Sequence, residues 1–265
     1  MDFTEFFQYL TTLLPFLPKI YNPVVYSASD LLQAFLWFFA AVISFYFSYG
    51  NARLWTSISV GFFLIFWSQA YLLNPYVSTY FRVTAVHTII GAVSILLISY
   101  GIQEYFTFTH TLEITGSKRA IYIATIGAII VGAVFVYLNP KPNLFILRNY
   151  RMAENVIWLF LSIVNILVIF KIYNEIKGSP VANGILGFAL VFFFIIMWKG
   201  SDLYLQVYQW DAPWQTLVEE FDLGLQTEGL DSIRVSLATA MQSIGATCSG
   251  ISVVGTFAYL IRLLR

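Results

Sequence analysis

The residues of this sequence that could do chemistry are polar and ionisable side chains inside or beside long hydrophobic segments. Burying a charge in a membrane is costly, so such side chains usually face one another, a ligand or a water-filled cavity. Several fall at one level of the predicted helix bundle, which we call the N-side end because the first hydrophobic segment starts there. The side chains predicted to form a polar pocket at this end are Asp30, Gln69, His87, Glu154, Lys199 and Asp202. The cations predicted at the pocket rim are Arg82, Arg151 and Arg234.

Such a pocket could bind a small polar or anionic ligand, or move a proton. The alternative is a structural role, because Asp30 and Glu154 stand at helix starts, where negative charge is favourable, and long side chains can reach the interface. Lys199 is the deepest cation of the sequence and precedes Asp202 by about one helical turn. We therefore expect these two residues to form an intrahelical ion pair. We expect no charge of comparable depth in the opposite, C-side half of the bundle.

The sequence carries no motif for a cofactor, a metal or an enzyme reaction. His87 and His110 are the two histidines, and a helix rise of about 1.5 Å per residue places them more than about 30 Å apart, too far to share a haem. Cys248 is the single cysteine, so thiols build neither a disulfide nor a zinc or iron–sulfur site. No nucleophile elbow, phosphate-binding loop or HExxH motif is present. Zero net charge without a basic run argues against nucleic-acid binding. We expect a non-enzymatic protein without a cofactor.

Long hydrophobic segments position these side chains. Of the 265 residues, 59% are hydrophobic and 11% are charged, whereas soluble domains have about 25% charged residues. A membrane-spanning helix needs about 20 mainly apolar residues. We therefore predict an all-α, polytopic membrane protein. Its seven predicted transmembrane helices are 29–49, 54–74, 82–106, 119–138, 152–173, 182–205 and 233–262.

Two further segments lie outside these helices. Apolar residues at helical spacing predict an interfacial amphipathic helix in residues 1–28, and its acidic start argues against a cleaved signal peptide. The loop 207–231 on the N side is acidic, and Asp211 and Pro213 are typical of a helix start within it. Seven spans put the termini on opposite sides. Basic residues beside the C-side helix ends predict a cell-membrane protein with its N-terminus outside and its C-terminus in the cytoplasm.

The transmembrane region, 29–265, contains signs of an internal duplication. Repeat A, about 29–106, and repeat B, about 152–262, would each hold three helices, joined by a linker helix at about 119–138. GFFLIF in the second segment matches GFALVF in the sixth, and RVT and IGA in the third segment match RVS and IGA in the seventh. Three helices, one linker helix and three helices give both triplets the same orientation, as in a parallel repeat.

This 3+1+3 plan resembles the superfamily that contains the PQ-loop and SWEET sugar transporters and the microbial opsins, over residues 29–262. The family motifs are missing, because no Pro-Gln pair ends a helix and the segment 233–262 has no lysine for a retinal Schiff base. The pattern is also similar to the seven-helix input modules that precede sensor kinases, here without an output domain. The resemblance implies an architecture and does not imply an activity.

Three functions fit these observations. The first is a receptor-like, sensor-like or accessory module that binds a small ligand or a partner subunit on its N side. The second is a transporter or channel for a small solute or for protons, and the third is a structural subunit of a larger membrane complex. The expected partners are the lipid bilayer and either further copies of the chain or other membrane subunits. Small-residue ridges could pack within the chain or contact such subunits, and they consist of Ala124, Ala128 and Gly132 in one helix and Gly245 and Ser249 in another.

Overall fold

The described part of the protein is helical throughout its regular structure. The computed structural model describes residues 28–50, 53–72, 81–112, 117–138, 144–208 and 232–264. Its helices are α2 (Ala28–Gly50), α3 (Leu54–Leu72), α4 (Phe81–Thr111), α5 (Lys118–Leu138), α6 (Leu144–Glu175), α7 (Pro180–Tyr208) and α9 (Ser232–Leu264). The predicted all-α class is confirmed for these residues.

Five of these helices are long and apolar enough to cross a membrane, by length and composition. The apolar stretches are Leu32–Tyr49, His87–Thr111, Asn149–Glu175, Pro180–Val207 and Arg234–Leu263. Helix α3 carries a shorter one, Leu54–Ala70. This is the architecture of a helical membrane protein, while the count of seven spans and the 3+1+3 repeat stay predictions. The predicted amphipathic N-terminal helix and the helix start at Asp211 and Pro213 lie outside the described residues.

Several helices extend beyond their hydrophobic segments. Helix α4 continues to Thr111 and α6 already begins at Leu144, although the predicted segments end at residue 106 and begin at residue 152. In the last turns of α4, Thr107 and Thr111 donate side-chain hydrogen bonds to the carbonyl oxygens four residues earlier. These hydroxyl groups are hydrogen-bonded within their own helix, which therefore accommodates polar residues after the hydrophobic segment. Hydrophobicity alone therefore placed these helix ends wrongly.

A tight turn joins α6 to α7 and makes the two helices antiparallel neighbours. Gly178 has a φ of 104°, a left-handed conformation that glycine adopts without strain from a Cβ. Ser179 follows, and its hydroxyl accepts a hydrogen bond from the Val181 backbone N–H at 3.3 Å, which caps the start of α7. Pro180 occupies the first position of α7, where its missing N–H costs little. The turn thereby fixes which residues of α6 face which residues of α7.

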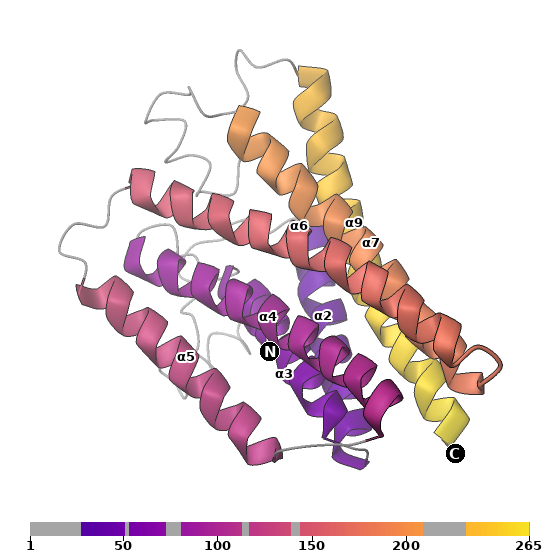
Figure 1. Cartoon of the computed structure of the whole chain (residues 1–265). Coiled ribbons are helices and arrows are strands. Elements are labelled where there is room, and N and C mark those ends of the chain that lie inside the picture. The colour runs from indigo at the N-terminus through magenta and orange to yellow at the C-terminus, as the bar shows by residue number, and fades with distance from the viewer. Residues whose placement is uncertain are drawn as a thin grey trace, which may run out of the picture.

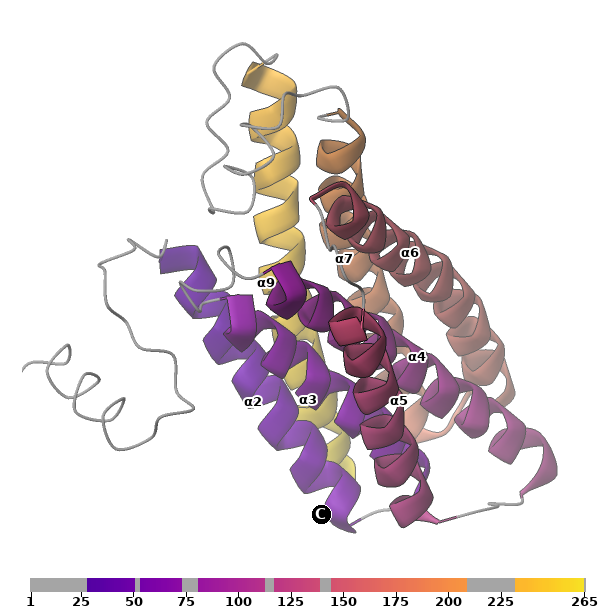
Figure 2. The ribbon, with the colours of Figure 1, turned by 90° about the vertical axis from the view of Figure 1, so that its left-hand side faces the viewer.

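Six of the helices form a closed ring. Contacts join α2 to α3, α3 to α4, α4 to α6, α6 to α7, α7 to α9 and α9 back to α2. Helix α5 lies outside this ring against α4, with a smaller contact to α3 (Figure 1, Figure 2). The helices fan apart toward the N-side end, at the top of Figure 2, and the C-terminus lies at the opposite end. Of the predicted small-residue ridges, Gly132 packs against α4 and Gly245 against α7, while Ala124 and Ala128 are exposed.

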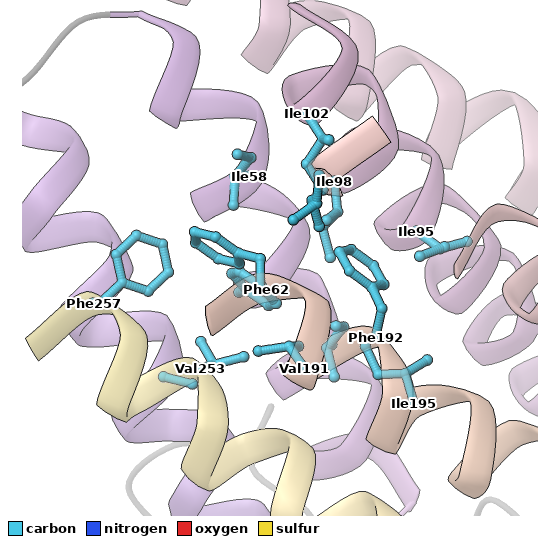
Figure 3. Close-up of a cluster of buried hydrophobic side chains, with 14 of the residues drawn as sticks. Ile58, Phe62, Ile95, Ile98, Ile102, Val191, Phe192, Ile195, Val253 and Phe257 are labelled. Carbon is cyan, nitrogen blue, oxygen red and sulfur yellow. The ribbon is translucent and has the colours of Figure 1, made fainter. Parts of the chain in front are cut away.

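Aromatic and branched side chains fill the centre of the ring. The Phe62 ring of α3 stacks on the Phe188 ring of α7, with centroids 6.5 Å apart and planes at 10°. Phe257 of α9 meets both rings edge-on, at 6.0 and 5.4 Å between centroids. Isoleucines and valines of α3, α4, α7 and α9 surround them (Figure 3). The ring axis is therefore occupied by packed side chains over this central layer.

Candidate functional site

A buried ion pair connects α6 to α7 near the N-side end. Lys199 Nζ donates a hydrogen bond to Glu154 Oε1 at 3.0 Å, and the two side chains are 10% and 4% exposed. The same ammonium group lies over two indole rings, 5.3 Å from the centroid of Trp158 and 4.9 Å from that of Trp198. A cation over an aromatic face gains electrostatic stabilisation, which is larger when the cation is desolvated. Lys199 is thus held by one carboxylate and two tryptophans.

The Glu154 carboxylate also lies against the backbone of α4. It fills the space in which a side chain at Gly91 would begin, so any larger residue at Gly91 would collide with Glu154 Oε1. Glycine at this position lets a charged group on α6 approach the α4 backbone closely. The ion pair is therefore enclosed by three helices, α4, α6 and α7.

Asp202 collects hydrogen bonds from three helices. Its Oδ1 accepts from Arg151 Nη2 of α6 at 2.9 Å and from Gln242 Nε2 of α9 at 3.2 Å. Its Oδ2 accepts from Asn155 Nδ2 of α6 at 2.7 Å and from Gln206 Nε2 of α7 at 3.4 Å. We call these residues together with the Lys199 pair the N-side cluster, namely Arg151, Glu154, Asn155, Lys199, Asp202, Gln206 and Gln242. It contains two carboxylates and two cations, so its formal charges balance.

The predicted pocket and rim residues divide into four groups. Glu154, Lys199 and Asp202 are in the N-side cluster, and Arg151, expected at the rim, is a direct partner of Asp202. His87 is buried one turn from Gly91 on α4, but its hydrogen bond joins Nδ1 to the Ser68 hydroxyl of α3 at 3.0 Å. Gln69 is half-buried on α3, and Arg234 is exposed on α9. Asp30 and Arg82 belong to α2 and α4, and their side chains are not among those that the structure describes.

The predicted intrahelical pair of Lys199 with Asp202 is wrong. Each of these residues pairs with a residue of α6, Glu154 and Arg151 respectively. The spacing on α7 allowed an ion pair, but α6 runs alongside and offers an opposite charge to each residue. A bond between helices satisfies each charge and also joins the two helices, which a pair within α7 would not do.

The C-side half, where no charge of comparable depth was expected, contains a largely buried ion pair. Arg53 Nη1 lies 3.0 Å from Glu104 Oε1, and these side chains of α3 and α4 are only 12% and 14% exposed. A second, more exposed pair joins His110 Nε2 of α4 to Glu175 Oε1 of α6 at 2.9 Å. The sequence separates Arg53 from Glu104 by a whole helical hairpin, so spacing gave no signal of this pair. The three amides of the N-side cluster were missed as well, although Asn155 and Gln206 each stand one turn after a charged member of it.

Five long apolar helices, with charged side chains paired inside the bundle, define a helical membrane protein. No three His, Cys, Asp or Glu side chains of the described ranges are grouped as metal ligands. No protein-family model, curated protein or solved structure matches the chain. The N-side cluster, held by α6, α7 and α9, is therefore the candidate functional site of the described residues.

Proposed function

We propose that the chain is a non-enzymatic, receptor-like or sensor-like membrane module that binds a small anionic or polar ligand at the N-side cluster. The observation that carries this proposal is the set of ion pairs and hydrogen bonds that ties α6 to α7 and α9 through Lys199 and Asp202. A ligand carboxylate or phosphate would compete with Glu154 for Lys199, or with Asp202 for Arg151. Because these bonds cross between helices, such an exchange would change how strongly the helices are held together.

Ligand binding at such a site would shift a conformational equilibrium. A ligand favours whichever helix arrangement it binds more tightly, and by no more than the difference in its affinities. Charges buried against tryptophans make that difference large, since an unpaired charge in this environment costs several kcal/mol. The N-side cluster therefore has the properties of a switch with two sets of partners, one internal and one supplied by the ligand.

A transporter or channel is the second candidate. The ring of contacts supports it, because helix neighbours repeat in the same order in the two predicted triplets, as in transporters with parallel repeats. The packed aromatic centre argues against an open path along the ring axis, since Phe62, Phe188 and Phe257 would have to separate. The receptor-like function needs no such path.

The test is ligand-dependent stability of the protein purified into lipid nanodiscs. A panel of small carboxylates, amino acids and phosphate esters would be screened by thermal unfolding. At about 100 times its dissociation constant, a ligand stabilises by about 2.7 kcal/mol, or roughly 5 °C for a chain of this size. We expect such a shift for at least one anionic compound, and we expect it to vanish in Lys199→Gln.

Two further variants make the result decisive. Lys171→Gln removes an exposed lysine from the C-side part of α6 and should keep the shift. Lys199→Gln with Glu154→Gln removes both charges together, so it tests binding in a protein without an unpaired buried carboxylate. A shift that survives in this double variant would contradict the proposal. Uptake of the same compound into sealed liposomes would favour the transporter, and copurification in one discrete large complex without any ligand response would favour the structural subunit.

A further inference from the structure

A groove of about 440 Å³ lies between α2 and α9 on the outer surface of the ring. It is lined by Ile43 and Tyr46 of α2 and by Ala258, Ile261 and Arg262 of α9. The two helices approach closely nearer to the N side, where Gly250 stands against Leu36. The groove lies about two turns nearer to the C-side end, at Ile43 and Ala258.

The floor of the groove is closed toward the ring centre. Phe47 of α2 and Phe257 of α9 are both buried, with ring centroids 5.5 Å apart behind the groove. The groove is therefore not an entrance to the interior of the bundle. It faces outward, on a surface where apolar side chains such as Phe39 and Val42 are also exposed, as expected for contact with lipid chains.

Residue types along the groove follow the order of groups in a phospholipid. Arg262 and Tyr46, the polar pair, stand about one turn from the C-side ends of α9 and α2. Ile43 and Ala258 lie about one turn deeper along the same two helices, and Ile261 directly precedes Arg262; all three are apolar. Because α2 and α9 both run from the N side to the C side, both helices place their polar residue at the headgroup level. In the part of the chain that the structure describes, Arg262 has no carboxylate partner.

We propose that this groove binds one anionic phospholipid on the C side of the membrane. The headgroup phosphate contacts the Arg262 guanidinium, which donates paired hydrogen bonds to phosphate oxygens, and the Tyr46 hydroxyl. One acyl chain lies along Ile43, Ala258 and Ile261. Basic grooves between transmembrane helices select anionic headgroups, and each nearby Arg or Lys contributes about fivefold in affinity. This inference is independent of the N-side cluster, which lies at the other end of the bundle.

The test compares lipids added to the full-length protein in a neutral detergent. Native mass spectrometry would count bound phosphatidylglycerol and phosphatidylcholine, which differ in headgroup charge. We expect one phosphatidylglycerol to bind about fivefold more tightly than phosphatidylcholine, and we expect Arg262→Gln to remove this preference. Arg119→Gln is the matched control, because Arg119 is an exposed C-side cation at the start of α5.

A second variant fills the groove while keeping its charge. Ala258→Trp adds a large side chain at an exposed position that lines the groove, so it should weaken binding of both lipids without disturbing the core. Equal affinity for the two lipids in the wild type would overturn the proposal, as would an unchanged preference in Arg262→Gln. Displacement of phosphatidylglycerol by inorganic phosphate at millimolar concentration would show an ion site without a lipid. Dimers that form through this face and exclude lipid would also refute it.

Discussion

Removing one partner of the Lys199–Glu154 pair should destabilise the protein far more than removing both. The pair is almost completely buried, so deletion of one charge leaves the other without a partner, which costs about 3–5 kcal/mol. Lys199→Met also removes the cation from the faces of Trp158 and Trp198, a loss of about 0.5–2 kcal/mol. We therefore expect each of Lys199→Met and Glu154→Gln to lose at least about 3 kcal/mol of unfolding free energy.

The double variant Lys199→Met with Glu154→Met should recover most of this loss. Replacing a buried ion pair by apolar groups of similar volume ranges from neutral to stabilising, so we expect it to lie within about 2 kcal/mol of the wild type. The four corners of the cycle are the wild type, Lys199→Met, Glu154→Met and this double variant, and reversible unfolding in mixed micelles, followed by far-ultraviolet circular dichroism, measures them. Losses that add within about 0.5 kcal/mol would refute the reasoning, because they would show that the two charges do not depend on each other.

The pair of His110 with Glu175 provides the exposed comparison for this experiment. These side chains are 47% and 37% exposed, and exposed ion pairs contribute about 0–1 kcal/mol. Glu175→Gln should therefore change the unfolding free energy by less than about 1 kcal/mol. A loss as large as that of Glu154→Gln would mean that burial does not control the strength of these pairs.

Two other substitutions and one control test the contacts that hold the helices together. Gly245→Ala should destabilise the protein by about 1–3 kcal/mol, because its Cβ would stand 2.6 Å from the Trp198 backbone nitrogen. Gly255→Ala is the control: its Cβ would have nothing within 4 Å, so it should be neutral or stabilising in the same unfolding assay. Ser99→Ala removes the acceptor of the buried 2.8 Å hydrogen bond from Asn165 Nδ2, and should cost about 0.6 kcal/mol and no more than about 1.7. An effect of Gly255→Ala equal to that of Gly245→Ala, or none for Ser99→Ala, would contradict these assignments.

The sequence brought Lys199, Glu154 and Asp202 to one level of the bundle but gave the wrong partners. Lys199 and Glu154 were placed at one level because helix directions and the rise per residue determine how far a residue lies from a membrane surface. Which faces of two helices meet depends on packing across the bundle, and hydrophobicity is almost uniform around a helix that contacts lipid on one side and protein on the other. The intrahelical pair with Asp202 was therefore the only pair that the sequence could propose.

Pairs between distant segments show the same limit. Arg53 begins α3 and Glu104 lies near the end of α4, so only the return of the chain through a helical hairpin brings them together. Gln242 on α9 donates a hydrogen bond to Asp202 on α7, 40 residues earlier in the chain. No spacing of residues in the sequence indicates this contact. Residue spacing in the sequence predicts neighbours within one helix. To predict these contacts, one must also know the order in which the helices are arranged in the ring.

That order agrees with the predicted duplication, as would any ring of six helices in chain order, so the duplication stays a prediction. If repeats A and B are related by a two-fold axis, α2 corresponds to α6, α3 to α7 and α4 to α9. The contact of α4 with α6 then corresponds to that of α9 with α2, and both contacts are present. The matched sequence stretches also make Phe62 equivalent to Phe188, and these two rings stack on each other at the ring centre, where a two-fold axis would pass.

A two-fold relation between the repeats predicts that Phe62 and Phe188 respond alike to substitution. Equivalent positions in equivalent surroundings should respond equally, so Phe62→Ala and Phe188→Ala should each cost about 3–5 kcal/mol, the range for a buried phenylalanine. Their effects should not add, because each ring is packed on the other. Phe63→Ala is the control, since the neighbouring ring on α3 is 38% exposed and should cost much less. Unequal losses for Phe62 and Phe188, measured by unfolding in micelles, would mean that the two matched stretches do not occupy equivalent places, and the similarity between them would then be compositional.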